Sequence, residues 1–167
     1  YYVRAYAINS SGTSYGNEYS FKTYLGTVVD VEGNEYYTTK IGMQTWMAEN
    51  LRTTKFSNGG GSLRLVTDDL EWIQLGTGDI AYCYYENLPE NSKIYGNLYT
   101  WAAASNYQRV CPTGWHLPND DEWTYLKDFL GGGNLAGGSL KETSTVHWAA
   151  PNTGATNISG FTALPNG

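Results

Sequence analysis

The feature that most constrains the fold of this chain is the stretch from residue 111 to residue 123, which reads CPTGWHLPNDDEW. Pro112 and Pro118 hold the backbone extended on either side of Gly114, because proline restricts both its own φ angle and the residue before it. Asn119 is a typical helix N-cap, and Glu122, three positions later, completes the pattern of a capping box. The stretch therefore predicts an extended segment that turns directly into a helix.

The predicted helix carries one apolar stripe. Trp123, Leu126 and the pair Phe129-Leu130 have the spacing of residues that face a core, and the glycines at 131–133 end the helix. Local signals of this strength are typical of a scaffold and not of a reactive centre. We therefore interpret the following residues of the stretch as structural: Cys111, Trp115, Pro118, Asn119, Glu122 and Trp123.

Charge and composition limit the partners of the chain. Its 167 residues contain 10 Lys and Arg against 16 Asp and Glu, and the net charge of −6 disfavours binding to a phosphate backbone. No apolar run is long enough to cross a membrane. With 15 Tyr, 6 Trp and only 16% charged residues, the composition is typical of secreted and cell-surface domains. We expect no nucleic acid partner and an extracellular or outer-surface location.

The two cysteines, Cys83 and Cys111, leave two interpretations open. In an oxidising compartment they could form a disulfide, which would contribute about 3–4 kcal/mol in the chain-entropy model. The alternative is a pair of free thiols, or a partner for one of them beyond residue 167. Neither cysteine belongs to a C-x-x-C pair, so the sequence does not indicate a zinc site.

The first 23 residues predict a β-hairpin. Residues 1–8 alternate like a strand, a turn follows at residues 9–12, and residues 18–23 return. The pattern Tyr-x-Val-x-Ala-x-Ala-x-Asn-x-x-Gly resembles the last two strands of a fibronectin type III or related immunoglobulin-like sandwich, with Tyr1 as its corner tyrosine. This resemblance implies that the rest of that sandwich lies upstream. A lone hairpin is marginal in water, so we expect it to pack on its neighbour or fray.

The remainder of the chain predicts short elements. A second hairpin is expected from residues 28–31 and 35–41, and a short strand at residues 44–47 that residues 51–54 extend after a kink. Residues 57–62 form a Gly-rich connector without the Lys and Ser/Thr of a phosphate loop. Residues 81–85 predict a strand, residues 88–93 a loop and residues 98–104 a short helix. Residues 143–167 contain turns without a helical period.

Several blocks in order resemble one bacterial family. They read D-x-E-G-N-x-Y from residue 30, I-G-x-Q-x-W-M-A-E-N-L-R from residue 41, Y-G-x-L-Y-x-W from residue 95 and C-P-x-G-W-H-L-P from residue 111. A-G-G-x-L-K follows from residue 136, P-N-x-G-A-x-N from residue 151 and S-G-F-x-A-L-P from residue 159. Residues 24–167 resemble the N-terminal portion of the Fibrobacter succinogenes major paralogous domain.

The family resemblance implies a fold class and a setting. The fold implied is α+β, a C-type-lectin-like domain of small twisted antiparallel sheets with one or two helices, related to the sulfatase-modifying enzymes that generate formylglycine. Members occur in bacterial surface proteins and lipid-anchored lipoproteins beside immunoglobulin-like modules. Members usually continue past the last block to a further cysteine, so we expect the closing strands to lie downstream.

Aromatic residues are the candidates for ligand binding. Tryptophan faces stack well against sugar rings, but tryptophan also buries a large area in cores. We predict that Trp46 and Trp101 are structural, like Trp115 and Trp123. Trp72 and Trp148 lie in polar surroundings, and at least one of the neighbouring tyrosines in residues 82–85 must be exposed because strand residues alternate in facing. The predicted ligand-binding residues are Trp72, Tyr84, Tyr85 and Trp148.

Polar residues give weaker indications. Glu49 and Asn50 are expected to satisfy backbone groups of a buried turn, and His116, between Trp115 and Leu117, is expected to be a packed ring. The acidic clusters at residues 68–71 and 119–122 lack the spacing of an EF-hand, although calcium remains an alternative to simple helix capping. We expect no other cofactor.

The sequence does not indicate an enzyme. It contains neither G-x-S-x-G nor H-E-x-x-H, and no nucleophile stands beside a base. A structure that gathered both imidazoles with carboxylates in one cleft would contradict this interpretation. We predict a non-catalytic module of a multi-domain bacterial surface protein, acting in adhesion or in binding a glycan or a surface protein. The alternatives are a structural spacer and an enzyme of the formylglycine-generating type.

Overall fold

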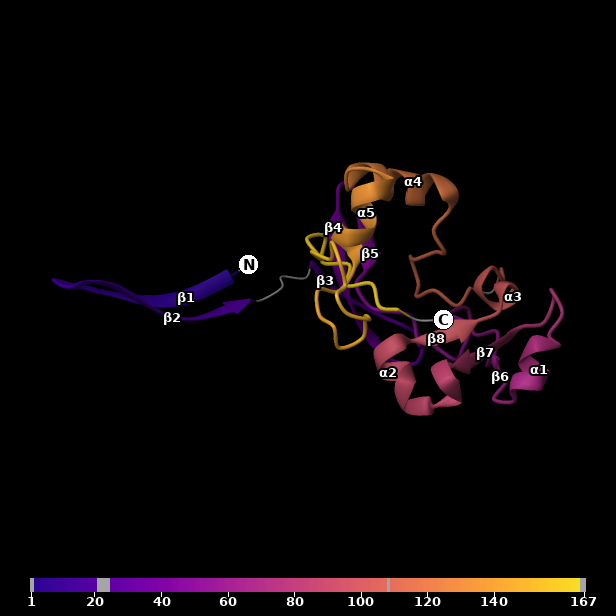
Figure 1. Cartoon of the computed structure of the whole chain (residues 1–167). Helices are drawn as coiled ribbons and strands as arrows, with labels where there is room; N and C mark the ends of the chain where they lie inside the picture. Colours follow the sequence, from indigo (N-terminus) through magenta and orange to yellow (C-terminus); the bar gives the residue numbers. More distant parts are fainter. Residues whose placement is uncertain (1, 21–24, 108, 166–167) are drawn as a thin grey trace.

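The computed structural model describes residues 2–20, 25–107 and 109–165, and these form three small β-sheets with short helices around them (Figure 1). The expected α+β class is confirmed. One detail differs from the expectation of antiparallel sheets, because the third sheet contains one short parallel pair. None of the described helices is long and apolar enough to cross a bilayer.

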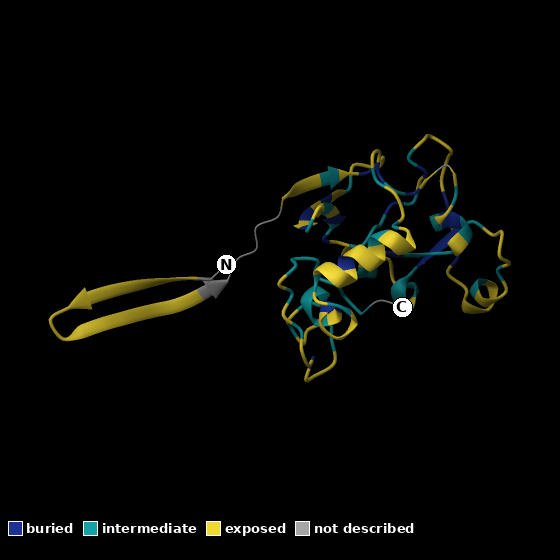
Figure 2. Cartoon of the chain, turned by 90° about the horizontal axis from the view of Figure 1, so that it is seen from above, coloured by how far each residue is buried: buried dark blue, intermediate teal, exposed yellow. Residues whose placement is uncertain are grey.

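The predicted N-terminal hairpin forms, but its second strand begins at Gly12 and not at residue 18, and the predicted corner tyrosine, Tyr1, and residues 21–23 lie outside the described residues. Strand β1 (Tyr2–Asn9) pairs antiparallel with β2 (Gly12–Ser20) around a two-residue turn. All side chains from residue 3 to residue 18 are exposed, and Figures 1 and 2 show the hairpin standing apart from the other elements. It packs on none of the described residues, contrary to one of the two expected outcomes. Its origin in a fibronectin-like domain stays a prediction.

The second sheet has the order β3-β4-β5 and is antiparallel throughout. Strands β3 (Gly26–Val29) and β4 (Glu35–Ile41) form the expected second hairpin, and β5 (Gln44–Met47) follows after a turn at Gly42. Strand β4 alternates exposed and buried residues from Glu35 to Thr38, but Thr39 and Ile41 are buried as well, so both faces of the strand meet packed side chains. The core of this sheet joins Ile41 and Trp46 to Leu126 of the long helix.

Two helices cover this core. Helix α4 (Asp120–Phe129) begins with the predicted capping box, in which Asn119 Oδ1 accepts from the Glu122 amide and the Glu122 carboxylate accepts from the Asn119 amide. The predicted stripe is only partly right. Leu126 is buried, but Trp123 is 44% exposed and Phe129 is also exposed, because α4 lies at the edge of a small core.

Helix α5 (Gly133–Leu140) was not predicted, because its three glycines oppose helix formation. It forms because Ala136 is buried against its neighbours. A Cβ at Gly138 would also collide with the carbonyl oxygen of Gly154, so only glycine allows the two backbones to approach this closely.

The third sheet has the order β6-β7-β8 and carries a second core. Strand β6 (Arg64–Leu65) runs parallel to β7 (Ala81–Tyr84), and β8 (Asn97–Tyr99) runs antiparallel to it. The core beneath this sheet contains Phe56, Leu63, Tyr82, Ala103 and Val110. The short helices around the sheet are α1 (Asp69–Ile73), η1 (Tyr85–Asn87), η2 (Pro89–Asn91), α2 (Ser92–Tyr95) and α3 (Trp101–Ala104).

Three local predictions were wrong here. Residues 88–93 contain η2 and the start of α2, and residues 98–104 divide into the end of β8 and helix α3, which Thr100 caps. Residues 51–54 are not a strand. Side chains hold them instead, because Asn97 Nδ2 donates to the Arg52 and Thr53 carbonyls and the Tyr99 hydroxyl donates to Thr53. The described tail after Lys141 is irregular, as predicted.

Candidate functional site

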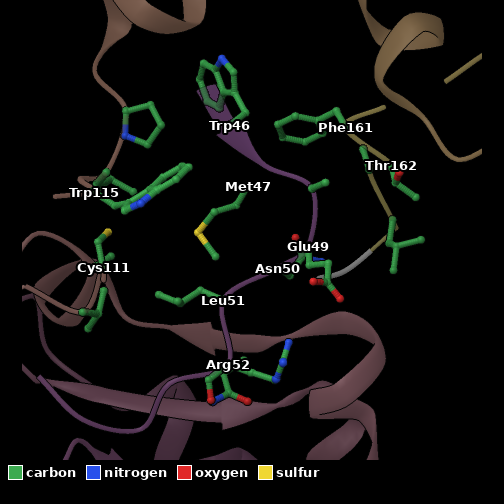
Figure 3. Close-up of a pocket in the computed structure, with 18 of the residues that line it drawn as sticks. Trp46, Met47, Glu49, Asn50, Leu51, Arg52, Cys111, Trp115, Phe161 and Thr162 are labelled. Carbon is green, nitrogen blue, oxygen red and sulfur yellow. The ribbon is translucent and has the colours of Figure 1, made fainter. Parts of the chain in front are cut away.

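An open cleft of about 880 Å³ lies between the two cores of the described residues. This volume is within the range of small-molecule binding sites. Its floor is the segment Gln44–Arg52, which runs from β5 toward the third sheet. One wall is the extended segment Gly114–Pro118, and the other is Phe161–Leu164 near the end of the described chain. Figure 3 shows side chains from all three segments around the open space.

Aromatic rings line one end of the cleft. Trp46 is 7% exposed and packs against Trp123 and Phe161, with ring centroids 4.8 Å and 5.9 Å away. Trp115 is half-buried on the opposite wall, near Met47 and Leu51 in Figure 3. The partly exposed faces of Trp115 and Trp123 are therefore available inside the cleft, while Trp46 supports them from the core.

A buried hydrogen-bond network fixes the floor. Tyr36 is fully buried, and its hydroxyl donates to Asp30 Oδ2 at 2.7 Å and accepts from the Arg52 amide at 3.1 Å. The Arg52 guanidinium lies over the Tyr36 ring at 4.4 Å and donates to the Glu35 carbonyl. Gly96 packs beneath the floor, where a Cβ would lie 2.6 Å from Asn50 Cβ. The floor is thus held in position by buried contacts, which favours a preformed site.

Ionisation follows from this network. Burial alone raises the pKa of Asp30, but hydrogen bonds from Tyr36, from the side chain and amide of Asn34 and from the Glu32 amide outweigh burial and lower the pKa. Burial and the bond to Asp30 raise the pKa of Tyr36 far above its usual value. Asp30 is therefore a carboxylate and Tyr36 a neutral phenol at neutral pH.

Both histidines line the cleft, and each contacts a carboxylate. His147 Nδ1 lies 2.9 Å from Glu142 Oε2, and the His147 ring meets the edge of Tyr95. His116 Nε2 lies 2.7 Å from Glu122 Oε1. The His116 side chain is 63% exposed, so the prediction of a packed ring was wrong. The arrangement that would contradict a purely structural interpretation of these residues is thus present, and the other lining residues decide what it can do.

The described lining residues include no serine or activated cysteine beside these imidazoles. Burial raises the pKa of the Cys111 thiol, and the nearby charge of Arg109 opposes this only in part, so Cys111 is a thiol at neutral pH. The described residues contain no group of three His, Cys, Asp or Glu side chains that could hold a metal ion. Cys111 and Cys83 are both free thiols in this structure.

None of the four residues predicted to bind ligand lines the cleft. Trp72 is half-buried in α1, Tyr84 packs edge-on against Tyr82, and Tyr85 packs against Tyr95. Trp148 donates its indole N–H to the Ala163 carbonyl, and Lys141 Nζ lies 4.3 Å above its ring. These contacts give Tyr84, Tyr85 and Trp148 packing roles.

The cleft instead gathers residues that the sequence placed in the scaffold. Trp46, Cys111, Trp115, Pro118, Glu122 and Trp123 all line it. Trp101 does not line the cleft and is 73% exposed, so the prediction that it is structural finds no support in its packing. Glu49 accepts from the Tyr37 amide, so it satisfies a backbone group of strand β4 and not of a buried turn, and the Asn50 side chain forms no hydrogen bond within the described residues, contrary to the prediction.

Sequence reasoning missed Phe161 and the His147–Glu142 pair. The pair lies within one irregular segment, where no periodicity predicts which side chains meet. A signal for Phe161 was present in the S-G-F-x-A-L-P block, which resembled the family.

Comparison with known families identifies the domain. The model of the Fibrobacter succinogenes major domain matches residues 39–167, which include β5, the cleft and both of its walls. The chain belongs to this family. It is a bacterial family of unknown function, and its match leaves the N-terminal hairpin and β3 outside. Among curated proteins and among solved structures, the chain has no significant match.

Proposed function

We propose that this Fibrobacter succinogenes major domain is a non-catalytic binding module of an extracellular or surface-anchored bacterial protein, and that its cleft binds a glycan. The observation that carries the proposal is the open cleft of about 880 Å³, whose lining includes the partly exposed indoles of Trp115 and Trp123 beside a fixed floor. Such a site matches the general form of ligand pockets, which combine apolar walls with a few placed polar groups.

A pyranose ring fits this combination. Its C–H face is apolar and packs on an indole, while its hydroxyls require hydrogen-bond partners at the ring edge. The faces of Trp115 and Trp123 supply the first requirement. Asn50 supplies the second, because its side-chain amide lines the cleft and makes no hydrogen bond within the described residues. The composition, rich in Tyr and Trp and poor in charge, supports an extracellular setting.

A second candidate function rests on the His147–Glu142 pair. A carboxylate that holds Nδ1 leaves Nε2 of the imidazole directed elsewhere, and such a pair can activate water as a general base. We favour binding because a base alone does not complete a site. The thiol at Cys111 is protonated, and the Thr162 hydroxyl already contacts Gly160 and Asn157.

Fluorescence titration tests the binding function. The domain is screened on a glycan array, and the glycans that bind are titrated while tryptophan emission is followed. We expect saturable quenching that Trp115→Ala weakens at least about tenfold, since an aromatic stacking contact contributes roughly 1–2 kcal/mol. Trp101→Ala is the matched control, because Trp101 is exposed outside the cleft. An array without signal, or equal affinity in both variants, would contradict the proposal and favour a structural spacer.

A separate assay tests the enzymatic candidate. Each glycan that binds is incubated with the domain, and new reducing ends are measured over time. We expect none. Turnover that His147→Ala abolishes while glycan affinity persists would replace the binding function with a hydrolytic one.

A further inference from the structure

A second, smaller hollow lies beside the cleft. It has a volume of about 320 Å³ and is lined by residues of the Gly-rich connector and of the segment before α4. These residues are Ser57, Asn58, Tyr107, Arg109, Pro112, Thr113 and Gly114. Gly114 also lines the cleft, so the two hollows adjoin at this shared residue.

The lining of this hollow favours an anion. Arg109 is its only charged residue, no carboxylate lines it, and the guanidinium forms no ion pair within the described residues. The hydroxyls of Tyr107 and Thr113 make no hydrogen bond to the described residues, and Tyr107 is 84% exposed. Asn58 Oδ1 accepts from the Gly60 amide, which leaves the Nδ2 donor of Asn58 available. One cation and several unpaired donors therefore surround the same space.

The backbone holds Arg109 in place without help from its side chain. Arg109 has a φ of 60°, in the left-handed region that residues other than glycine rarely adopt. Its amide donates to the Asn106 carbonyl, and its own carbonyl accepts from the amide and the hydroxyl of Ser57. An unfavourable conformation fixed by three hydrogen bonds is typical of a functional position.

The charge of Arg109 also acts on the adjoining cleft. Burial raises the pKa of Cys111, which lines the cleft, and the positive charge of Arg109 opposes that effect. Arg109 stands two positions before Cys111, a lining residue of the cleft, and its hollow adjoins the cleft at Gly114, so its charge lies on the side from which a negative group of a bound molecule would reach it.

We propose that this hollow is a subsite for a single oxyanion, a carboxylate or a sulfate ester, carried by an otherwise neutral glycan in the cleft. The inference rests on the proposed glycan binding and specifies its ligand class. A polyanion does not fit, because the protein's net charge of −6 repels an extended negative chain. A single carboxylate or sulfate ester bound beside Arg109 interacts mainly with the positive charge of that residue, since salt screens the more distant charges.

The test compares pairs of oligosaccharides that differ by one sulfate ester or one uronate carboxylate. We expect the wild-type protein to bind the acidic member about fivefold more tightly, as a partly exposed charged contact provides. Arg109→Asn should remove this preference and leave the affinity for the neutral member unchanged. Asparagine tolerates a positive φ, so the variant keeps the local backbone. Arg64→Ala is the control, because Arg64 pairs with Glu71 outside both hollows.

Two results would overturn the subsite. One is equal affinity of wild-type protein for both members of each pair, and the other is a loss in Arg109→Asn that affects both members alike. Thr113→Val, which removes one donor without altering charge, should reduce the preference partially.

Inorganic sulfate separates failure of the subsite from failure of glycan binding. Titrated into the ¹⁵N-labelled protein, sulfate should shift the amide resonances of Gly60 and Thr113 in the wild type and not in Arg109→Asn. If sulfate shifts them and no oligosaccharide binds, the anion site stands and the proposed glycan function is refuted. If neutral oligosaccharides bind and sulfate shifts nothing, the cleft function stands and the subsite is refuted.

Discussion

Replacing Tyr36 by phenylalanine tests the network that holds the cleft floor. The hydroxyl of Tyr36 donates to the Asp30 carboxylate and accepts from the Arg52 amide, and the whole side chain is inaccessible to solvent. Tyr36→Phe removes one oxygen and leaves the ring, its packing and the position of the Arg52 guanidinium over it. The substitution therefore isolates two hydrogen bonds.

The expected loss of stability is about 3 kcal/mol. A hydrogen bond to a charged group contributes about 1.5–3 kcal/mol, and a buried donor without a partner costs about 1–3 kcal/mol. The two contributions share one oxygen and are not additive, so we take a value within their combined range. For a domain of this size, that loss lowers Tm by about 6–12 °C.

Thermal unfolding followed by circular dichroism measures the effect. Tyr107→Phe makes the same chemical change at an exposed hydroxyl that forms no hydrogen bond within the described residues, so its Tm should stay within about 1 °C of wild type. If Tyr36→Phe also stays within that limit, the network does not fix the floor and our reasoning is wrong.

The same variant predicts a pH dependence. The hydrogen bonds lower the pKa of Asp30 in the folded state, so their stabilisation is complete above the unfolded pKa, about 3.9, and is lost as the pH falls through the folded value. The difference in unfolding free energy between wild type and Tyr36→Phe should therefore be largest at neutral pH and shrink below about pH 4. A difference that grows on acidification would contradict this sign.

Three further perturbations have defined outcomes. Asn119→Ala removes the capping box with Glu122 and should destabilise the domain by about 1 kcal/mol in urea unfolding. Gly96→Ala places a methyl group 2.6 Å from Asn50 Cβ at a φ of 73° and should cost more than about 2 kcal/mol in the same assay, with weaker glycan binding because the floor shifts. Cys111, whose pKa burial raises, should react with iodoacetamide roughly tenfold more slowly than free cysteine at pH 7 and accelerate as pH rises, measured by mass spectrometry.

Each of these has a control. Gly59→Ala has a similar φ of 81° with nothing within 4 Å of the new methyl group, so it measures backbone strain without the contact. A cost equal to that of Gly96→Ala would show that the floor does not require close packing. Cys83→Ser leaves Cys111 as the only thiol, and its rate should not change. Unaltered unfolding of Asn119→Ala would show that the cap contributes nothing.

Local signals predicted the elements whose causes lie within a few residues. Helix α4 begins where Asn119 and Glu122 cap it. Both hairpins form where the sequence alternates in the manner of β-strands on either side of a turn. The α+β class followed from a resemblance carried by several ordered blocks, and the family match confirms it. Contacts between segments that are distant in the sequence could not be predicted. Helix α5 forms despite its glycines because its packing compensates for their poor propensity.

The candidate site shows the same division. The sequence identified Trp46, Trp115 and Trp123 as residues with large packing surfaces, and that property is intrinsic to the indole. It could not determine that residues 44–52, 114–118 and 161–164 meet around one open space, because loop segments without periodicity are placed by tertiary contacts alone. The sequence also suggested that Trp148 binds ligand. In the structure the Trp148 indole N–H donates to the Ala163 carbonyl, and Lys141 Nζ lies over the indole ring.

The amino-acid sequence alone therefore determined the positions of turns and helix ends and the side chains that must be buried. These signals depend on residues that lie only a few positions apart. Only the assembled structure decided which indoles keep a free face, and that both imidazoles border the same space. Those properties depend on what neighbouring segments leave uncovered, and the described residues leave a cleft between two small cores that no single segment encodes.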